Sequence, residues 1–306
     1  MKRIVTIIMS AFMLTVLPAT AQNLDNLWAT GSAVPGGVQK LTKRPDGQFR
    51  FAGALNAGEL KIMNTETYVK GTTYFLKPQL VDSYLINYGL GYQLTNDSLQ
   101  PGWVVSFQED TYRFLVNVND KKVTGELMLP WNELLIAGSA FLGGSDDVEW
   151  KRDNMLSFVR DHDNPYIFTW TGELGYYDNV VEPGCFKLEG QMTWGPRELH
   201  PYTDNEDITQ STQVCLGGPD RKWKVGTPGR YRITVDLFNE TVHGELLVSN
   251  AQTAPEVSKV TEISTETVSN NDCVYDLQGR SLVKQVRGLN LVRQADGKVR
   301  KVWKAQ

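Results

Sequence analysis

The residues of this sequence best suited to binding chemistry are aromatic side chains in segments rich in glycine and proline. The 306-residue chain holds eight tryptophans and twelve tyrosines. Trp194 stands in the segment MTWGPREL, where an exposed tryptophan is easier to explain by a ligand than by a core. A flat aromatic face can stack on an apolar ring, and charged neighbours can hydrogen-bond to its hydroxyl groups. This combination makes such segments candidates for a ligand-binding site.

The candidate residues fall into two related sets. The main set lies in the second half of the chain, with aromatic platforms at Trp194, Trp223 and Tyr202 and polar groups at Lys187, Arg197 and Asp220. The equivalents in the first half are Trp103, Lys61 and Tyr68. Two alternatives stay open, because Trp223 begins a predicted strand and could equally cap the core, and Lys187 could lie on a solvated strand edge. Trp150, in DDVEWKR, lies in an insertion of the second half, and a hydrophobic plug under the loop is the alternative to a functional role there.

Catalytic chemistry finds little support in the sequence. A glycosidase needs two placed carboxylates, whereas the acidic clusters at 145–149 and 203–207 are more typical of solvated loops. The second cluster lacks the calcium-binding pattern of an EF-hand. The three histidines lie far apart, and GxSxG and HExxH motifs are absent from the sequence. We therefore expect no enzyme activity, no cofactor and no metal site.

The sequence contains an internal repeat. LWATGSAVPGG at 27–37 matches LLIAGSAFLGG at 134–144, and TYRFLVNVNDKKVTGEL at 111–127 parallels RYRITVDLFNETVHGEL at 230–246. The alignment places Lys61 opposite Lys187 and Trp103 opposite Trp223. Self-similarity over this length indicates two copies of one domain in tandem. The second copy carries insertions, and insertions usually map to loops, where function tends to lie.

The periodicity within each copy is two residues. Apolar and polar side chains alternate from Tyr112 to Asn119 and from Tyr231 to Phe238, which is the pattern of half-buried strands. Turn residues follow each run, and a partner strand returns after it. The sequence predicts an all-β chain of tandem antiparallel β-sandwiches, immunoglobulin-like or like carbohydrate-binding modules, with a small C-terminal β domain.

Composition divides the chain into five segments. A basic start, an apolar run at 4–17 and Ala19–Gln22 with A-x-A spacing predict a signal peptide at 1–21, and export to the cell surface, outer membrane or medium. The remaining predicted segments are a first sandwich at 22–129, a second at 130–249, a linker at 250–258 and a C-terminal domain at 259–306. No later apolar run is long enough for a transmembrane segment, and a net charge of −4 argues against nucleic acid as a partner.

Export makes disulfides possible, but the cysteine count is odd. Cys185 and Cys215 are the better pair, because both lie in the predicted second sandwich. Three buried free thiols explain the count equally well, and the spacing fits no zinc motif.

The aligned repeat resembles the SusE/SusF family of starch-utilisation surface proteins. The match covers residues 24–248 and is better in the second copy, where these segments carry it: LLIAGSAFLGG, NPYIFTWTGEL, PGCFKLEGQMTWGPRELHPYTDNEDI and RKWKVGTPGRYRITVDLFNETVHGEL. The resemblance implies β-sandwich domains outside the outer membrane that bind glucan chains without cleaving them, beside other glycan-uptake proteins. The C-terminal VYDLQGRSL and RGLNLVRQADGKVRKVWK resemble a type IX secretion sorting domain, with Asn290 where tyrosine is common.

The sequence thus predicts a secreted, non-catalytic protein that holds polysaccharide, expected to be a starch-like glucan, for uptake or degradation. Two alternatives remain at this stage: a cell-surface adhesin or structural protein that binds protein partners, and a glycoside hydrolase.

Overall fold

The computed structural model describes residues 24–146, 149–178 and 180–249, together with four strands between residues 273 and 304. The described residues form sheets that are antiparallel apart from one short parallel pair, together with a single short 3-10 turn, η1 (Arg152–Asn154), which confirms the predicted all-β fold class. The chain divides into two compact units, Met1–Gly226 with Tyr231–Leu247 and Thr227–Arg230 with Val248–Gln306.

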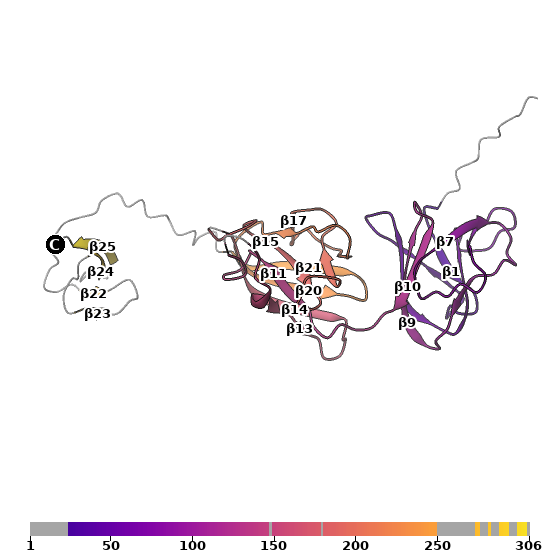
Figure 1. The fold of residues 1–306 in the computed structure, drawn as a ribbon, viewed down its shortest axis with the longest axis horizontal. Helices are drawn as coiled ribbons and strands as arrows, with labels where there is room; N and C mark the ends of the chain where they lie inside the picture. The colour runs from indigo at the N-terminus through magenta and orange to yellow at the C-terminus, as the bar shows by residue number, and fades with distance from the viewer. Residues whose placement is uncertain are drawn as a thin grey trace, which may run out of the picture. The chain divides into compact units, whose positions relative to one another are not determined.

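The first half of the larger unit is a sheet folded over its own core, drawn in indigo and purple in Figure 1. The strand order is β2-β1-β5-β6-β7-β10-β9-β4-β3, and β8 pairs with β5. The fold-over occurs at β7, because its first half pairs with β10 and its second half with β6. The strands are β1 (Trp28–Thr30), β2 (Val38–Lys40), β3 (Thr42–Lys43), β4 (Phe49–Leu55), β5 (Gly58–Met63), β6 (Phe75–Pro78), β7 (Asn87–Thr95), β8 (Trp103–Val105), β9 (Asp110–Asn117) and β10 (Lys122–Leu127).

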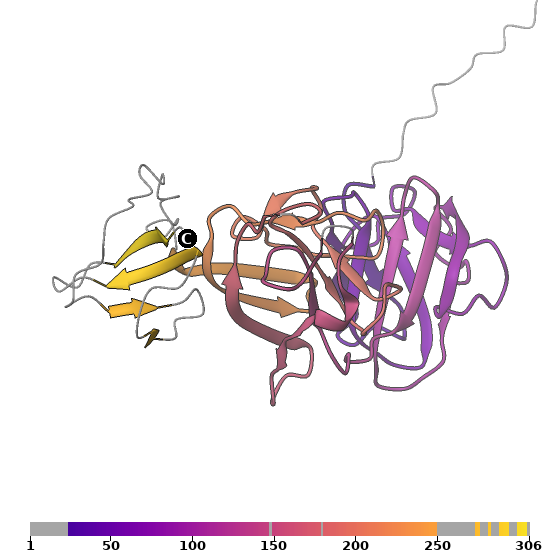
Figure 2. The same cartoon turned by 60° about the vertical axis from the view of Figure 1, so that its left-hand side comes forward.

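The second half of this unit is a sandwich of two sheets, drawn in magenta to orange in Figures 1 and 2. One sheet runs β12-β11-β15-β16-β18, with β19 beside β15 and β17 parallel to β19, and the other runs β13-β14-β20-β21. The strands are β11 (Leu135–Gly138), β12 (Leu156–Ser157), β13 (Val159–Arg160), β14 (Ile167–Leu174), β15 (Cys185–Glu189), β16 (Glu198–His200), β17 (Glu206–Asp207), β18 (Cys215–Leu216), β19 (Trp223–Lys224), β20 (Gly229–Asp236) and β21 (Thr241–Ser249).

Each half has its own hydrophobic core, filled by the inward side chains of alternating strands. In β20, Tyr231, Ile233 and Val235 are buried and the intervening residues are not, as the period of two predicts. In β9 the alternation is broken, because Arg113 is buried between Tyr112 and Phe114. Arg113 faces the second half of the unit, where it pairs with Glu240.

The two matching glycine segments occupy equivalent places. Gly31 follows β1 and Gly138 ends β11, and both have positive φ, of 107° and 151°. A Cβ on Gly31 would lie 2.3 Å from the Glu59 carbonyl oxygen, and one on Gly138 would lie 2.3 Å from that of Cys185. Only glycine fits such a close approach of two backbones. These glycines therefore shape the chain where it passes a neighbouring strand, which explains why the motif recurs.

The Cys185–Cys215 disulfide, one of the two alternatives that the sequence left open, does not form. Cys185 and Cys215 are both free and buried. Cys185 lies on β15 and Cys215 on β18, and β16 separates these strands in the sheet. Strands two places apart are about 9.5 Å apart, beyond the roughly 7 Å that a disulfide spans between Cα atoms. The Cys215 Sγ instead accepts a hydrogen bond from Arg44 Nη2 at 3.3 Å.

In the smaller unit, four antiparallel strands run in the order β23-β22-β24-β25. Val292 is buried. The predicted signal peptide at 1–21 and linker at 250–258 lie outside the described residues. No helix in the described part of the chain has the length and apolar character to cross a membrane. The strands are β22 (Cys273–Tyr275), β23 (Ser281–Leu282), β24 (Gly288–Arg293) and β25 (Val299–Lys304).

Candidate functional site

Three predicted site residues of the second sandwich, Lys187, Trp194 and Asp220, meet in one open pocket of about 390 Å³. We call it the tryptophan pocket. Its wall is formed by a side chain of β15 and by four loops that come together only when the sandwich is folded. The lining residues are Glu149, Trp150, Val181, Glu182, Lys187, Trp194, Asp220 and Lys222.

Two tryptophan rings form the aromatic part of the pocket. The ring centroids of Trp150 and Trp194 lie 6.5 Å apart, and the ring planes are inclined by 53°. Trp194 is 40% exposed, and its segment between β15 and β16 contains Gly195 with a positive φ. Trp150 is held by a hydrogen bond from its Nε1 to the Val181 carbonyl oxygen at 3.3 Å. The two rings thus present an angled aromatic surface at the mouth of the pocket.

Two lysines lie against these rings. Lys187 Nζ is 4.9 Å from the Trp194 ring centroid, and Lys222 Nζ is 5.5 Å from that of Trp150. Both distances are within the range of cation–π attraction. Asp220 joins the lysines, because its Oδ1 is 3.3 Å from Lys187 and its Oδ2 is 3.2 Å from Lys222. The lysines and Asp220 are therefore fixed in place before any ligand arrives.

The charges of the pocket hold one another ionised. Burial by itself would lower the pKa of Lys187, but bonds to Glu198, Glu189 and Asp220 raise it above its ordinary value. Burial would likewise raise the pKa of Asp220, and the two lysines lower it. Asp220 is exposed and remains a carboxylate, so it offers acceptor oxygens to hydroxyl groups.

A buried polar network supports the pocket from behind. Lys187 Nζ lies 3.3 Å from Glu189 and 3.1 Å from Glu198. Glu189 has no exposed surface, and burial raises its pKa to about 7 against the opposing charge of Lys187. His200 Nε2 is 3.2 Å from Glu198 Oε2, and its Nδ1 is 2.9 Å from the Arg221 carbonyl oxygen. The network fixes Lys187 and so fixes the floor of the site.

Two predicted platforms lie in the core instead. Trp223 has no exposed surface, its ring stacks on Phe186 with centroids 5.8 Å apart, and its Nε1 donates to Ser211 Oγ at 3.0 Å. Trp103 is likewise fully buried in the core of the first half. Neither ring can stack on a ligand, so their prediction as platforms is wrong. Their recurrence reflects a shared core position.

Tyr202 and Arg197 lie outside the tryptophan pocket. The Tyr202 hydroxyl accepts a hydrogen bond from Arg44 Nε at 2.6 Å, across the junction between the two halves of the larger unit. Burial raises the pKa of Tyr202 despite this arginine. Arg197 lines a different pocket at the same junction. The prediction that these two residues join Lys187, Trp194 and Asp220 in one site is therefore wrong.

The first-half candidates Lys61 and Tyr68 meet in a pocket of about 400 Å³. Lys61 pairs in β5 with Thr30 of β1, just as Lys187 in β15 pairs with Ala137 of β11, so the two lysines are topologically equivalent. Lys61 Nζ donates to the Ser98 carbonyl oxygen at 2.9 Å, and Tyr68 is 43% exposed. The lining contains tyrosine and phenylalanine but no tryptophan: Thr30, Val38, Lys61, Met63, Glu66, Thr67, Tyr68, Phe75 and Ser98.

Sequence reasoning did not select five of the eight residues that line the tryptophan pocket, namely Glu149, Trp150, Val181, Glu182 and Lys222. Trp150 belongs to an insertion of the second copy, and that position in a functional loop was an available signal. It is partly exposed and lines the pocket beside Trp194, which does not fit the alternative of a hydrophobic plug under the loop. Glu182 and Lys222 carried no comparable signal, because isolated charges are usually solvated surface residues.

Comparison with known proteins does not assign this chain to a family. No family model and no curated protein sequence matches the chain. Among solved structures, SusF from Bacteroides thetaiotaomicron matches with a TM-score of 0.34 and 12% identity, over 92% of this chain and 72% of that chain. At that TM-score the likeness carries no weight for the function of this chain.

Proposed function

We propose that this chain is an exported, non-catalytic carbohydrate-binding protein of the cell surface, and that the tryptophan pocket binds a polysaccharide. The observation that carries the proposal is the pair Trp150 and Trp194, which stands over a fixed arrangement of Lys187, Asp220 and Lys222. Aromatic faces suit the apolar sides of sugar rings, and the charged floor suits their hydroxyl groups.

The inclination of the two rings bears on which glycan fits. Coplanar rings would suit a flat, ribbon-like chain, whose sugar faces lie in one plane. Rings inclined by 53° with centroids 6.5 Å apart suit successive sugars of a curved chain. A helical, starch-like glucan has that curvature, and we propose it as the ligand class.

Three carboxylates line the pocket, those of Glu149, Glu182 and Asp220, and Asp220 is the one whose ion pairs argue against acid catalysis. Glycoside hydrolysis needs one carboxyl group that stays protonated to act as an acid. The pKa of Asp220 is lowered by two lysines, so that carboxyl is unsuited to donate a proton at neutral pH. Glu189 has a raised pKa, but it is fully buried and is not among the residues that line the pocket.

The Lys61–Tyr68 pocket is proposed as a weaker second site. It keeps the equivalent lysine but offers an exposed tyrosine rather than paired tryptophans. Two weak sites on one chain gain apparent affinity for a long polymer through effective concentration.

Affinity electrophoresis of the full chain in gels containing starch, pullulan, cellulose derivatives and other neutral glycans tests the proposal. We expect retardation by starch-like glucans, and we expect Trp194→Ala and Trp150→Ala each to weaken binding at least about tenfold. Tyr84→Ala is the matched control, because Tyr84 is 56% exposed and lines none of the pockets described above.

Retardation by no glycan in the panel would overturn the binding proposal. Unchanged retardation of both tryptophan variants would overturn the site. Release of reducing ends from any bound glucan by the purified chain would overturn the non-catalytic role.

A further inference from the structure

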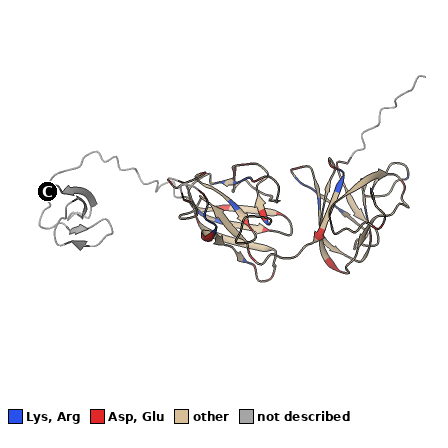
Figure 3. Cartoon of the chain, in the orientation of Figure 1, with Lys and Arg blue, Asp and Glu red and all other residues tan. Residues whose placement is uncertain are grey.

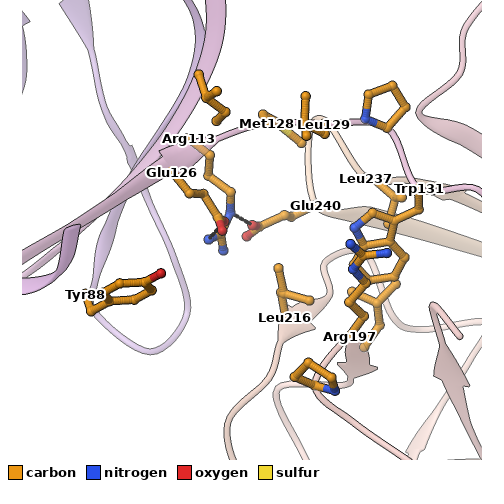
Figure 4. A pocket seen from close by; sticks show the side chains of 14 residues that line it. Tyr88, Arg113, Glu126, Met128, Leu129, Trp131, Arg197, Leu216, Leu237 and Glu240 are labelled. Carbon is orange, nitrogen blue, oxygen red and sulfur yellow. Dashed lines mark hydrogen bonds and ion pairs between the residues drawn. The ribbon is translucent and has the colours of Figure 1, made fainter. Parts of the chain in front are cut away.

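A second, chemically different pocket lies at the junction of the two halves of the larger unit. We call it the junction groove, and it has a volume of about 500 Å³, within the range of small-ligand sites. Figure 4 shows Tyr88 on one side, Trp131 and Arg197 on the other, and Arg113 with Glu126 and Glu240 between them. The lining is Tyr88, Arg113, Glu126, Leu127, Met128, Leu129, Pro130, Trp131, Pro196, Arg197, Leu199, Leu216, Leu237 and Glu240.

Arg113 is a buried cation whose hydrogen-bonding capacity is incompletely used. The residue is 8% exposed, its Nε is 2.6 Å from Glu240 Oε1, and its Nη1 is 3.0 Å from Glu126 Oε1. Its Nη2 has no hydrogen-bond partner within the described residues. A buried guanidinium nitrogen without a partner carries a desolvation penalty that a suitably placed acceptor would remove.

Arg197 supplies a second, exposed guanidinium to the same groove. Across the described ranges, its side chain takes part in no ion pair or hydrogen bond, and only its backbone N–H donates, to Gln191. An arginine fork free of protein partners is suited to bidentate pairing with a carboxylate. The groove thus holds two guanidiniums, each with N–H groups that have no partner among the described residues.

Three arginines gather behind the groove around one carboxylate, and Arg44 also pairs with Asp46 at 3.4 Å. Glu240 is the shared carboxylate of three arginines, because Arg44 and Arg50 approach it at 3.7 Å and 3.1 Å in addition to Arg113. Glu126, the remaining partner of Arg113, has a side chain that is 53% exposed. An incoming anion could displace that exposed carboxylate without leaving it buried.

The remaining walls suit a ring rather than an extended peptide. Tyr88 is fully exposed, Trp131 is partly exposed, and Leu129 is 71% exposed. Aromatic and apolar surfaces on facing walls can hold the two faces of a sugar ring. We propose that the junction groove binds an acidic saccharide, whose carboxylate pairs with Arg113 and Arg197 while its ring lies between Tyr88 and Trp131.

Calorimetric titration of the full chain with oligogalacturonate at low salt tests this proposal. We expect binding that weakens as salt is added, since ion pairing at a partly exposed site is screened. Arg197→Gln should weaken it about tenfold or more, because hydrogen bonds to charged groups are the strong ones. Arg232→Gln is the matched control, because Arg232 is half exposed and pairs only with exposed Glu245 among the described residues.

The outcomes separate this groove from the tryptophan pocket. Trp194→Ala should lose starch binding and keep oligogalacturonate binding, and Arg197→Gln should do the reverse. No oligogalacturonate binding at low salt, or equal binding by Arg197→Gln of unchanged thermal stability, would overturn the proposal. Equal binding of polyglutamate would overturn the sugar assignment in favour of an acidic peptide.

Discussion

Lys187 links the ligand surface of the tryptophan pocket to the interior of the second sandwich. Its ammonium lies against Trp194 on one side and contacts Glu189, Glu198 and Asp220 on the others. The side chain is 9% exposed, so its charge depends on those carboxylates for compensation. Of the three, Glu189 is the one that burial makes reluctant to ionise.

Glu189 gives the protein a pH-dependent stability of unusual sign. Its folded pKa of about 7 lies above the ordinary value of 4.5, so the folded state binds this proton more tightly than the unfolded chain. The stability that the protonated Glu189 side chain contributes to the folded state is fully present below about pH 4.5, and it is lost as the pH rises toward and beyond 7.

We therefore expect Glu189→Gln to raise the melting temperature relative to wild type at pH 8 and to leave it nearly unchanged at pH 4.5. Circular dichroism melts at both pH values measure this, with exposed Glu133→Gln as the control. A melting temperature of Glu189→Gln that falls equally at both pH values would contradict the raised pKa.

At the scale of elements, the repeated glycine segment is required by the packing of β11 against β15. A Cβ on Gly138 would meet the Cys185 carbonyl oxygen at 2.3 Å and Phe186 Cα at 2.6 Å. Both are backbone atoms, so the strand itself would have to move. Gly143 differs, because its nearest potential contact is the Asn154 side chain at 3.9 Å.

We expect Gly138→Ala to lower the free energy of unfolding by about 2–3 kcal/mol, from the steric clash and the positive φ together. Gly143→Ala should cost about 1 kcal/mol, from its positive φ alone. Urea denaturation followed by tryptophan fluorescence measures both variants, and equal losses would show that the backbone clash is relieved at no cost.

At the scale of the whole molecule, Glu240 joins the two halves of the larger unit. It is 5% exposed, and its carboxylate meets Arg50 and Arg113 of the first half at 3.1 Å and 2.6 Å. Arg50 also donates to the Phe238 carbonyl oxygen. In Figure 3 the positions of acidic and basic residues are interspersed along the strands and loops of these two halves.

Glu240→Ala leaves three arginines without their shared carboxylate, and we expect a loss of about 3–5 kcal/mol in stability. Calorimetry should show this loss with a separation of the transition into two, because the halves no longer support each other. The surface pair Arg232–Glu245 supplies the control, and Glu245→Gln should cost at most about 1 kcal/mol. A Glu240→Ala variant with a single unshifted transition would show that the junction contributes no stability.

The sequence by itself determined the strands and the repeat, because both are encoded in local patterns. The sequence shows the period of two in β9, β10 and β20 without any structure, and it shows the matched glycine segments as well. It also identified Trp194 and Asp220, since glycine and proline mark a loop directly, and Lys187, which recurs in the first copy as Lys61.

Only the tertiary structure decided which aromatic rings are available to a ligand. Trp194 and Trp223 are the same residue type in similar polar surroundings, yet one is 40% exposed and the other is fully buried. Their difference depends on which sheet face each ring meets, and that is set by packing between segments far apart in the chain. Tertiary structure likewise separated Cys185 from Cys215 by an intervening strand. It also moved Arg197 from the predicted site to the junction groove, because that groove exists only where the two halves meet.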